Sequence, residues 1–271
     1  MRARRIFSWL VFVPILWAMG CGTLGLGDGG TIARIEKTGE LRVAMAGDYP
    51  PMNVRTRDGR LIGLEVDLAA ALASILEVEL VTVEKPFGEL LEAVTAGEAD
   101  LAISGITMTP RRNMEVAFAG PYYVSRKALL GKTETLVGLA DLTDLEGQGL
   151  RVAAVSGSTS EMLVKKLLPN SQHLIEPTQQ DAVERVLRGQ ADVMVGDDPV
   201  VRFALLRNPY AGLAFVESAF SAEPLGIAIS ADDPLFVNLV ENFLRNLEFM
   251  GLMNTLRATW FENGVWLELL P

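Results

Sequence analysis

The chain has only one cysteine, Cys21, and one histidine, His173, among its 271 residues. A lone cysteine cannot form a disulfide within the chain. One histidine and one cysteine are too few for a zinc-type cluster, and they offer no convincing Ser-His-Asp or Cys-His set. We therefore expect no metal, no cofactor and no catalytic group of these kinds. His173 lies in a polar stretch and is expected at the surface.

Clusters of basic residues are also missing from the body of the chain, whose formal net charge is -10. This makes nucleic acid an unexpected partner. An acidic surface alone selects no ligand. The length is sufficient for two modest domains, each with its own core.

An apolar run of about 20 residues, the length that a membrane-spanning helix needs, is missing as well. The shorter run Ile6–Ala18 follows the basic start Met1–Arg5, and together they predict an export signal over residues 1–20. Cys21 ends this stretch as in a bacterial lipobox, where the cysteine is acylated; the alternative is an incidental thiol. Residues 21–30 would then be a flexible tether. We expect a periplasmic or cell-surface lipoprotein.

What the chain does contain is one pattern that occurs twice. Residues 41–48 read LRVAMAGD and residues 150–157 read LRVAAVSG. Each copy is followed by Gly-x-Ala-Asp and an apolar run, at residues 97–105 and 189–197. Two copies predict two similar lobes with a cleft between them that can enclose a small molecule.

The expected elements alternate along the chain, which is typical of α/β lobes with largely parallel sheets. Short buried strands are predicted at residues 41–46, 80–83, 101–104, 150–155, 193–195 and 227–229. Helices are predicted around residues 66–76, 90–94, 162–167 and 183–187, and over 235–261 with a break near Gly251.

The second lobe is expected as an insertion in the first. Lobe 1 would comprise residues 31–123 plus 226–271, and lobe 2 residues 124–225. The chain would cross twice between the lobes, forming a two-strand hinge that permits closure around a ligand.

The sharpest local signal surrounds Arg112. Thr109 is a good N-cap and Pro110 suits the first helical position, which predicts a helix with Arg112 in its first turn. The helix dipole disfavours a cation there. An anion shared with the Thr107 hydroxyl would offset this cost; the alternative is an arginine in solvent or paired with Glu115. The position after a strand favours the ligand.

The second lobe carries a matching loop, Ser156–Ser160, between a strand and a helix. Its small residues let backbone N–H groups and hydroxyls, including those of Ser158 and Thr159, face an anion. The alternative is turn chemistry with Ser158 or Ser160 as the helix cap. The loop is too short, and lacks the lysine, for a nucleotide-binding P-loop.

Asp197 ends the strand of the second copy. Asp198 could cap the helix that Pro199 starts, which would leave Asp197 free to face the cleft and accept hydrogen bonds from an ammonium group. The alternative is that both aspartates are caps. Tyr49 and Phe87 follow strands of lobe 1 and could either wall a pocket or belong to the core.

These residues resemble those of the type II periplasmic solute-binding proteins. The most similar group is the polar amino-acid group, also called bacterial extracellular solute-binding protein family 3. The stretches that carry the resemblance lie in order along the chain, at residues 48–51, 63–69, 97–100, 105–112, 121–123, 156–159 and 251–261.

The resemblance implies two Rossmann-like lobes that close on an amino acid, which an ABC permease then imports. It implies that Arg112 holds the ligand's carboxylate and that Asp197 takes its ammonium. Tyr49 would cover the side chain. Departures at Ala46, where some binders of basic amino acids carry an acid, and at Val155 and Gly196 leave the side-chain specificity open.

The predicted ligand-binding set is Tyr49, Phe87, Gly105, Thr107, Arg112, Ser158, Thr159 and Asp197. Within this set, the resemblance implies that Gly105, Thr107 and Thr159 form additional hydrogen bonds with the ligand. We expect a monomeric receptor that binds without turnover.

The alternative is a dehydratase of the prephenate or arogenate type on the same scaffold. It would need an acid in the pocket besides Asp197, with a pKa raised enough to protonate a leaving hydroxyl. The candidates for this acid that the sequence offers are Asp48 and Glu89, and neither has a persuasive setting.

Overall fold

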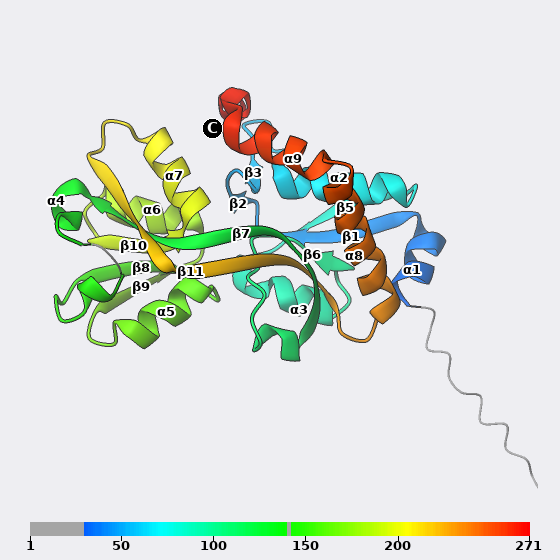
Figure 1. Cartoon of the computed structure of the whole chain (residues 1–271), viewed down its shortest axis with the longest axis horizontal. Helices are drawn as coiled ribbons and strands as arrows, with labels where there is room; N and C mark the ends of the chain where they lie inside the picture. The colour runs from blue at the N-terminus through cyan, green and yellow to red at the C-terminus, as the bar shows by residue number, and fades with distance from the viewer. Residues whose placement is uncertain (1–29, 140–141) are drawn as a thin grey trace, which may run out of the picture.

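The chain folds into two lobes that lie next to each other along its long axis (Figure 1). This computed structural model describes residues 30–139 and 142–271. The predicted export signal, Cys21 and all of the predicted tether except Gly30 lie outside the described residues. Two long strands, β7 (Val116–Lys132) and β11 (Leu213–Ser230), pair antiparallel and run from one lobe to the other.

Each lobe surrounds its strands with helices, as the alternating pattern predicts. Lobe 1 contains α1 (Thr31–Thr38), β1 (Glu40–Met45), α2 (Leu64–Ile75), β5 (Glu79–Glu84), α3 (Leu90–Thr95), β6 (Leu101–Ala102), α8 (Pro234–Phe249) and α9 (Leu252–Arg257). It also carries a small antiparallel sheet of β2 (Asp48–Tyr49), β3 (Asn53–Arg55) and β4 (Leu61–Ile62). Lobe 2 contains α4 (Thr133–Leu136), β8 (Arg151–Val155), α5 (Thr159–Leu167), β9 (Gln172–Glu176), α6 (Gln179–Leu187), β10 (Val193–Asp197) and α7 (Asp198–Arg207).

The strands form one continuous eight-stranded sheet in the order β5-β1-β6-β11-β7-β10-β8-β9. Pairing is parallel within β5-β1-β6 and within β10-β8-β9. The two hinge strands pair antiparallel with each other and with their outer neighbours. The prediction of largely parallel sheets is therefore confirmed in each lobe, and the antiparallel pairs are those made by the two strands that cross between the lobes.

The residues of the repeated sequence make the same contacts in both lobes. The first strand of each copy lies between the two that follow it, and the aspartate of Gly-x-Ala-Asp is bonded to the arginine of that first strand. Asp100 accepts hydrogen bonds from the Arg42 backbone (2.7 Å) and guanidinium (2.9 Å). Asp192 accepts them from the Arg151 backbone (2.8 Å) and guanidinium (2.6 Å). The arginine–aspartate pair therefore connects β6 to β1 in lobe 1 and β10 to β8 in lobe 2.

The structure differs from the prediction at one helix and at elements that the sequence did not indicate, among them α1, β2 to β4 and β9. The expected helix after Pro110 is only a short 3-10 turn, Arg112–Met114, and β7 follows almost at once. Strand β9 was not predicted, because it is an edge strand whose residues, including the half-buried His173, are mostly polar or only partly covered. The other edge strand, β5, was predicted because residues 80–83 form a longer, mostly apolar run.

The C-terminal helices pack on lobe 1, as expected, with Gly251 in a left-handed conformation (φ 73°) between α8 and α9. The last residues also reach lobe 2. The indole of Trp266 lies against Trp260, which donates a 2.7 Å hydrogen bond to Asp67 of α2. On the lobe 2 side, Phe203 of α7 stacks on Trp266 with ring centres 5.8 Å apart. The end of the chain therefore touches both lobes.

The exact division between the lobes stays a prediction. The proposed boundaries at residues 123/124 and 225/226 fall inside β7 and β11, which continue through them. A shift in the register of these strands lies between Leu225 and Ile227.

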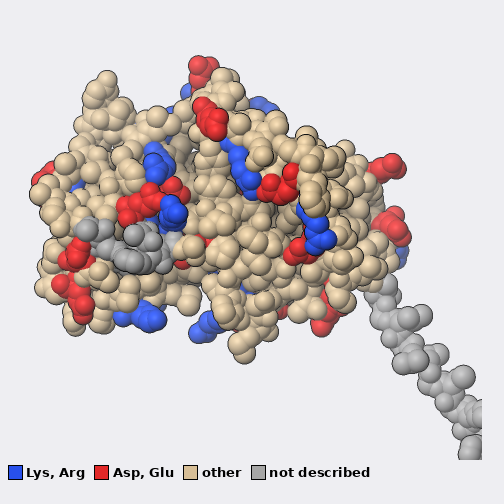
Figure 2. All heavy atoms as spheres, viewed as in Figure 1, with Lys and Arg blue, Asp and Glu red and all other residues tan. Residues whose placement is uncertain are grey.

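On the face shown in Figure 2, acidic and basic side chains are interspersed and often adjacent. Within residues 30–139 and 142–271, no helix has the length and apolarity that crossing a membrane requires.

Candidate ligand-binding site

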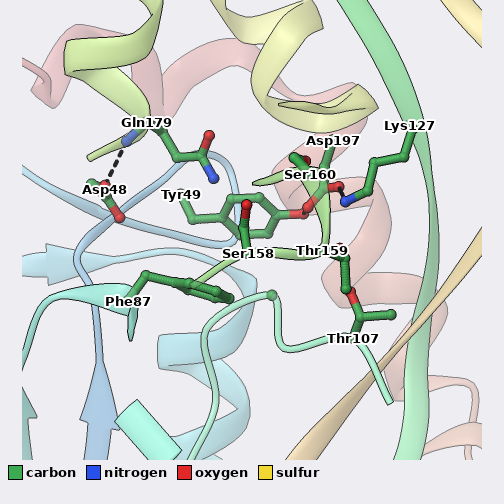
Figure 3. Close-up of a pocket in the computed structure, with 11 residues that line it drawn as sticks. Asp48, Tyr49, Phe87, Thr107, Lys127, Ser158, Thr159, Ser160, Gln179 and Asp197 are labelled. Carbon is green, nitrogen blue, oxygen red and sulfur yellow. Dashed lines mark hydrogen bonds and ion pairs between the residues drawn. The ribbon is translucent and has the colours of Figure 1, made fainter. Parts of the chain in front are cut away.

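A pocket lies between the lobes, where the loops that follow β1, β6 and β8 meet the end of β10 (Figure 3). The carboxyl ends of parallel strands are where open α/β sheets bind ligands. The pocket is lined by Asp48, Tyr49, Phe87, Gly105, Thr107, Lys127, Ser158, Thr159, Ser160, Gln179 and Asp197. Seven of the eight residues predicted from the sequence are among them. Arg112 is not, but its guanidinium contacts two of the lining residues, Thr107 and Phe87.

Asp197 faces the pocket from lobe 2 and is 7% exposed. Its side chain makes no cap bond to α7, and Asp198, expected to cap that helix, instead pairs with Arg202 at 2.7 Å. Across the pocket, the Tyr49 hydroxyl of lobe 1 donates a 2.9 Å hydrogen bond to Asp197 Oδ2 (Figure 3). Burial, together with the charge of Asp197, raises the pKa of Tyr49 well above its usual value, so this hydroxyl keeps its proton.

Lys127 was not singled out by the sequence, yet it is one of the charged groups that line the pocket. It lies on β7 directly opposite Asp197 in the antiparallel pairing with β10. Its ammonium is 2.5 Å from Asp197 Oδ1 and 3.9 Å from Glu223 Oε2. The lysine is 2% exposed. A single lysine in a long strand gives no sequence signal for a pocket, because its position depends on sheet register.

Arg112 is hydrogen-bonded to backbone carbonyls of both lobes. Its guanidinium donates to the Thr107 carbonyl of lobe 1 (2.9 Å) and to the Gly157 carbonyl of lobe 2 (3.0 Å), and it lies over the Phe87 ring. Burial lowers the pKa of Arg112, opposed by the negative charges of Glu223 and Asp197.

The predicted reason for this position of Arg112 is wrong, because a three-residue 3-10 turn has almost no dipole to oppose a cation. Thr109 does accept a hydrogen bond from the Arg112 backbone, at 3.2 Å. The guanidinium is instead placed by the two carbonyl groups that it bonds.

The hydroxyls of the two lobes also meet. Thr107 and Thr159 lie with their oxygens 3.4 Å apart, and Thr159 donates to Glu223 at 3.2 Å. Ser158 is the cap of α5, as one alternative anticipated: its hydroxyl accepts from the Glu161 backbone and donates to the Val155 carbonyl. The Ser158 hydroxyl is therefore already committed within lobe 2.

The far end of the pocket is closed by Asp48, which accepts a 2.8 Å hydrogen bond from the Gln179 backbone of lobe 2. Burial raises the pKa of Asp48, and the nearby charge of Asp181 adds to this. The Gln179 side-chain oxygen is buried and has no hydrogen-bond partner among the described residues. Both groups are acceptors, so this end suits a ligand group that donates hydrogen bonds.

A buried carboxylate supports the pocket from within lobe 1. Glu65 accepts hydrogen bonds from the Gly105 backbone (2.7 Å), the Tyr122 hydroxyl and the Asn53 amide. Burial raises the pKa of Glu65 to about 7, against the lowering effect of these donors. The Gly105 N–H is therefore engaged within the protein. A side chain at Gly105 would collide with the Tyr49 ring, since a Cβ there lies 2.4 Å from it.

The lobes are closed tightly on this site. The enclosed space is about 10 Å³, roughly the room that one water molecule needs. A Cβ on Gly157 of lobe 2 would lie 2.8 Å from the Gly88 backbone of lobe 1, so the two backbones almost touch. An amino acid can therefore enter only after the lobes separate and the contacts across the pocket break.

A larger groove of about 440 Å³ lies beside the pocket and shares Asp48 and Gln179 with it. It is bounded by the β2–β3 region, α6, α7 and the end of the chain. No group of three or more metal-ligating side chains gathers anywhere in the part of the chain that the structure describes.

The sequence from residue 41 to residue 263 matches a known family throughout, the bacterial extracellular solute-binding proteins, family 3. The chain belongs to this family. Its two Rossmann-like lobes, two-strand hinge and interlobe pocket are those of a type II periplasmic binding protein. The resemblance noted from the sequence is thus confirmed.

Individual relatives include both receptors and an enzyme. The chain is 25% identical over 225 residues to the ABC transporter arginine-binding protein 1 of Escherichia coli K12, covering 82% of this chain and 90% of that protein. It is 26% identical over 229 residues to the cyclohexadienyl dehydratase of Pseudomonas aeruginosa PAO1, covering 84% and 85%.

A solved structure is also similar, that of an ancestral amino acid-binding protein described as a precursor of cyclohexadienyl dehydratase. It superposes with a TM-score of 0.80 at 32% identity, over 86% of this chain and all of the other. The similar proteins of this solute-binding protein therefore include amino-acid-binding proteins, by sequence and by structure, and one dehydratase, by sequence.

Proposed function

We propose that the protein captures an amino acid between its lobes and delivers it to an ABC permease. The observation that carries the proposal is the convergence of Arg112, from lobe 1, and Asp197, from lobe 2, on one interlobe site. A guanidinium is suited to a carboxylate and a buried carboxylate to an ammonium. Gly105, Thr107, Ser158 and Thr159 line the same site, with Tyr49 and Phe87 as its aromatic walls.

The contacts between the lobes at this site are of the kind a ligand can replace. Arg112 now bonds two backbone carbonyls, and a bidentate carboxylate would make stronger, charge-assisted bonds in their place. Tyr49 would release Asp197 when the lobes open. The acceptors Asp48 and Gln179 at the other end favour a side chain that donates hydrogen bonds, in keeping with the arginine-binding relative.

A thermal-shift screen with the common amino acids tests this proposal. At least one should raise the unfolding temperature, because a ligand that binds only the folded chain stabilises it by mass action. Arg112→Ala and Asp197→Ala should weaken its binding by roughly 30-fold or more, about 2 kcal/mol. Arg111→Ala, at the exposed neighbouring arginine, is the control and should bind normally. Full binding by the Arg112 and Asp197 variants would refute the assigned roles.

We further propose that Cys21 is acylated and holds the receptor, as a monomer, at the membrane outside the cytoplasm. The basic start, apolar run and cysteine support this. Metabolic labelling with a fatty acid should mark the wild-type chain and spare Cys21→Ser. Equal labelling of both would exclude the anchor.

A dehydratase remains the second candidate, and Asp48 is the observation that favours it. Asp48 lines the pocket and its pKa is raised, as a proton donor to a leaving hydroxyl requires. Glu89, the other acid considered, does not line the pocket. Consumption of prephenate or arogenate that is abolished in Asp48→Asn would replace the receptor proposal; we expect no turnover.

A further inference from the structure

The ammonium of Lys127 is already paired with the carboxylate of Asp197, the group that would bind the ammonium of a ligand. In Figure 3 its side chain reaches from β7 to Asp197 at one end of the pocket. The 2.5 Å contact joins two side chains that are both at least nine-tenths buried. A buried carboxylate without a counter-charge is costly, and here the protein supplies that counter-charge itself.

This ion pair does not depend on closure of the lobes. Lys127 and Asp197 are opposite each other in the paired strands β7 and β10, so their side chains are neighbours by sheet register. The Tyr49–Asp197 hydrogen bond, in contrast, crosses the pocket and breaks on opening. The site that meets an incoming ligand therefore contains Asp197 already paired with a cation.

The consequence concerns which ligands the pocket accepts. A ligand that has a carboxylate but no amino group would leave Asp197 unpaired in a pocket without Lys127. With Lys127 present, Asp197 stays paired with a cation when such a ligand binds. An ammonium still finds a partner, because Lys127 is shared with a second carboxylate, Glu223 (3.9 Å). Amino acids are accepted, but their amino group contributes less.

We propose that Lys127 is a specificity-determining residue that substitutes for the ligand's ammonium at Asp197. The pocket therefore takes carboxylates with or without an α-amino group. This inference rests on the proposed function, in which Arg112 receives the carboxylate of the ligand.

Matched pairs of amino acids and their des-amino analogues test the inference on the full chain by titration calorimetry. Suitable pairs are L-arginine with 5-guanidinopentanoate, L-glutamine with 4-carbamoylbutanoate, and L-phenylalanine with 3-phenylpropanoate. For each pair that binds, the dissociation constants should agree within about tenfold in the wild type.

In Lys127→Met, which keeps the length but removes the charge, the analogue should lose at least about 30-fold more affinity than the amino acid. Asp197→Asn added to Lys127→Met removes the unpaired carboxylate and should bring the two affinities together again. Because each readout is a ratio within one protein, a general loss of stability does not imitate it.

The outcomes separate this inference from the function on which it rests. If amino acids bind to the wild type and the analogues bind more than about 100-fold weaker, Lys127 does not substitute for the ammonium although the receptor proposal stands. An unchanged ratio in Lys127→Met would likewise overturn the role of Lys127 alone. If no common amino acid binds in the thermal-shift screen and no analogue binds, both proposals fail; if the screen finds an amino acid outside these three, the ratio is measured with that amino acid and its own des-amino analogue. Should Lys127→Met not fold, the wild-type ratio alone decides.

Discussion

At the scale of single residues, the charge state of Glu65 links the stability of the fold to pH. It is fully buried beneath the pocket, and burial raises its pKa from 4.5 to about 7. Between these values the folded chain keeps a proton that the unfolded chain releases. Unfolding then releases a proton, so the free energy of unfolding falls as the pH rises from 4.5 to 7.

The size of this effect can be measured with Glu65→Gln, which removes the titration and keeps an oxygen for Tyr122 and Gly105. Relative to this variant, the wild type should lose roughly 3 kcal/mol of stability across that range and nothing further above it. Urea unfolding at several pH values gives the comparison. Parallel curves for the two proteins would show that Glu65 does not titrate there.

Gly105 offers a second test at this scale, because it combines a left-handed backbone (φ 63°) with the close approach of the Tyr49 ring. Gly105→Ala should cost about 1 kcal/mol in backbone strain plus about 1–3 kcal/mol for the collision. Gly97 has a similar φ of 71° but no neighbour within 4 Å. Gly97→Ala should therefore show the strain alone. Equal losses of stability in the two variants would argue against the collision.

At the scale of the elements, the end of the chain has a role of its own. Residues 264–271 lie beyond the stretch that matches the family, and they bridge the lobes. Trp266 stacks on Phe203 of lobe 2, and the Arg207 side chain of α7 donates to the carbonyl of Pro271. Arg57 of lobe 1 donates to the Leu270 carbonyl at 2.8 Å.

Trp266→Ala should therefore favour the open arrangement of the lobes and enlarge the radius of gyration of the free chain in X-ray scattering. Val265→Ala, which alters a 70% exposed neighbour in the same turn, should leave that radius unchanged. If Trp266→Ala scatters like the wild type, the contacts of the tail do not hold the lobes together.

The elements also show what the sequence could reveal. The two copies of strand, helix and Gly-x-Ala-Asp were recognisable because Arg42–Asp100 and Arg151–Asp192 are local to each lobe. The helix expected after Pro110 did not form, since β7 begins at Val116 and leaves no room for it. Lys127 was missed because its place depends on pairing with β10, about 70 residues away, which no local pattern encodes.

At the scale of the whole molecule, closure is the event that connects the fold to binding. The pocket now has room for about one water molecule, and its walls are paired with each other across the lobes. A ligand must replace these pairs with its own contacts. Its binding free energy is therefore the difference between the closed form with the ligand and the closed form without it, and not the sum of the ligand's contacts. The two hinge strands are the segments that would bend on such opening, since they are the connection between the lobes.

The most direct measurement is a crystal structure with the amino acid that gives the largest thermal shift. We expect the amino acid to lie between the lobes, with its carboxylate about 3 Å from the Arg112 guanidinium and its ammonium on the side of Asp197. An amino acid seated instead in the neighbouring groove of α6 and α7, with Arg112 still bonded to Thr107 and Gly157, would contradict this expectation.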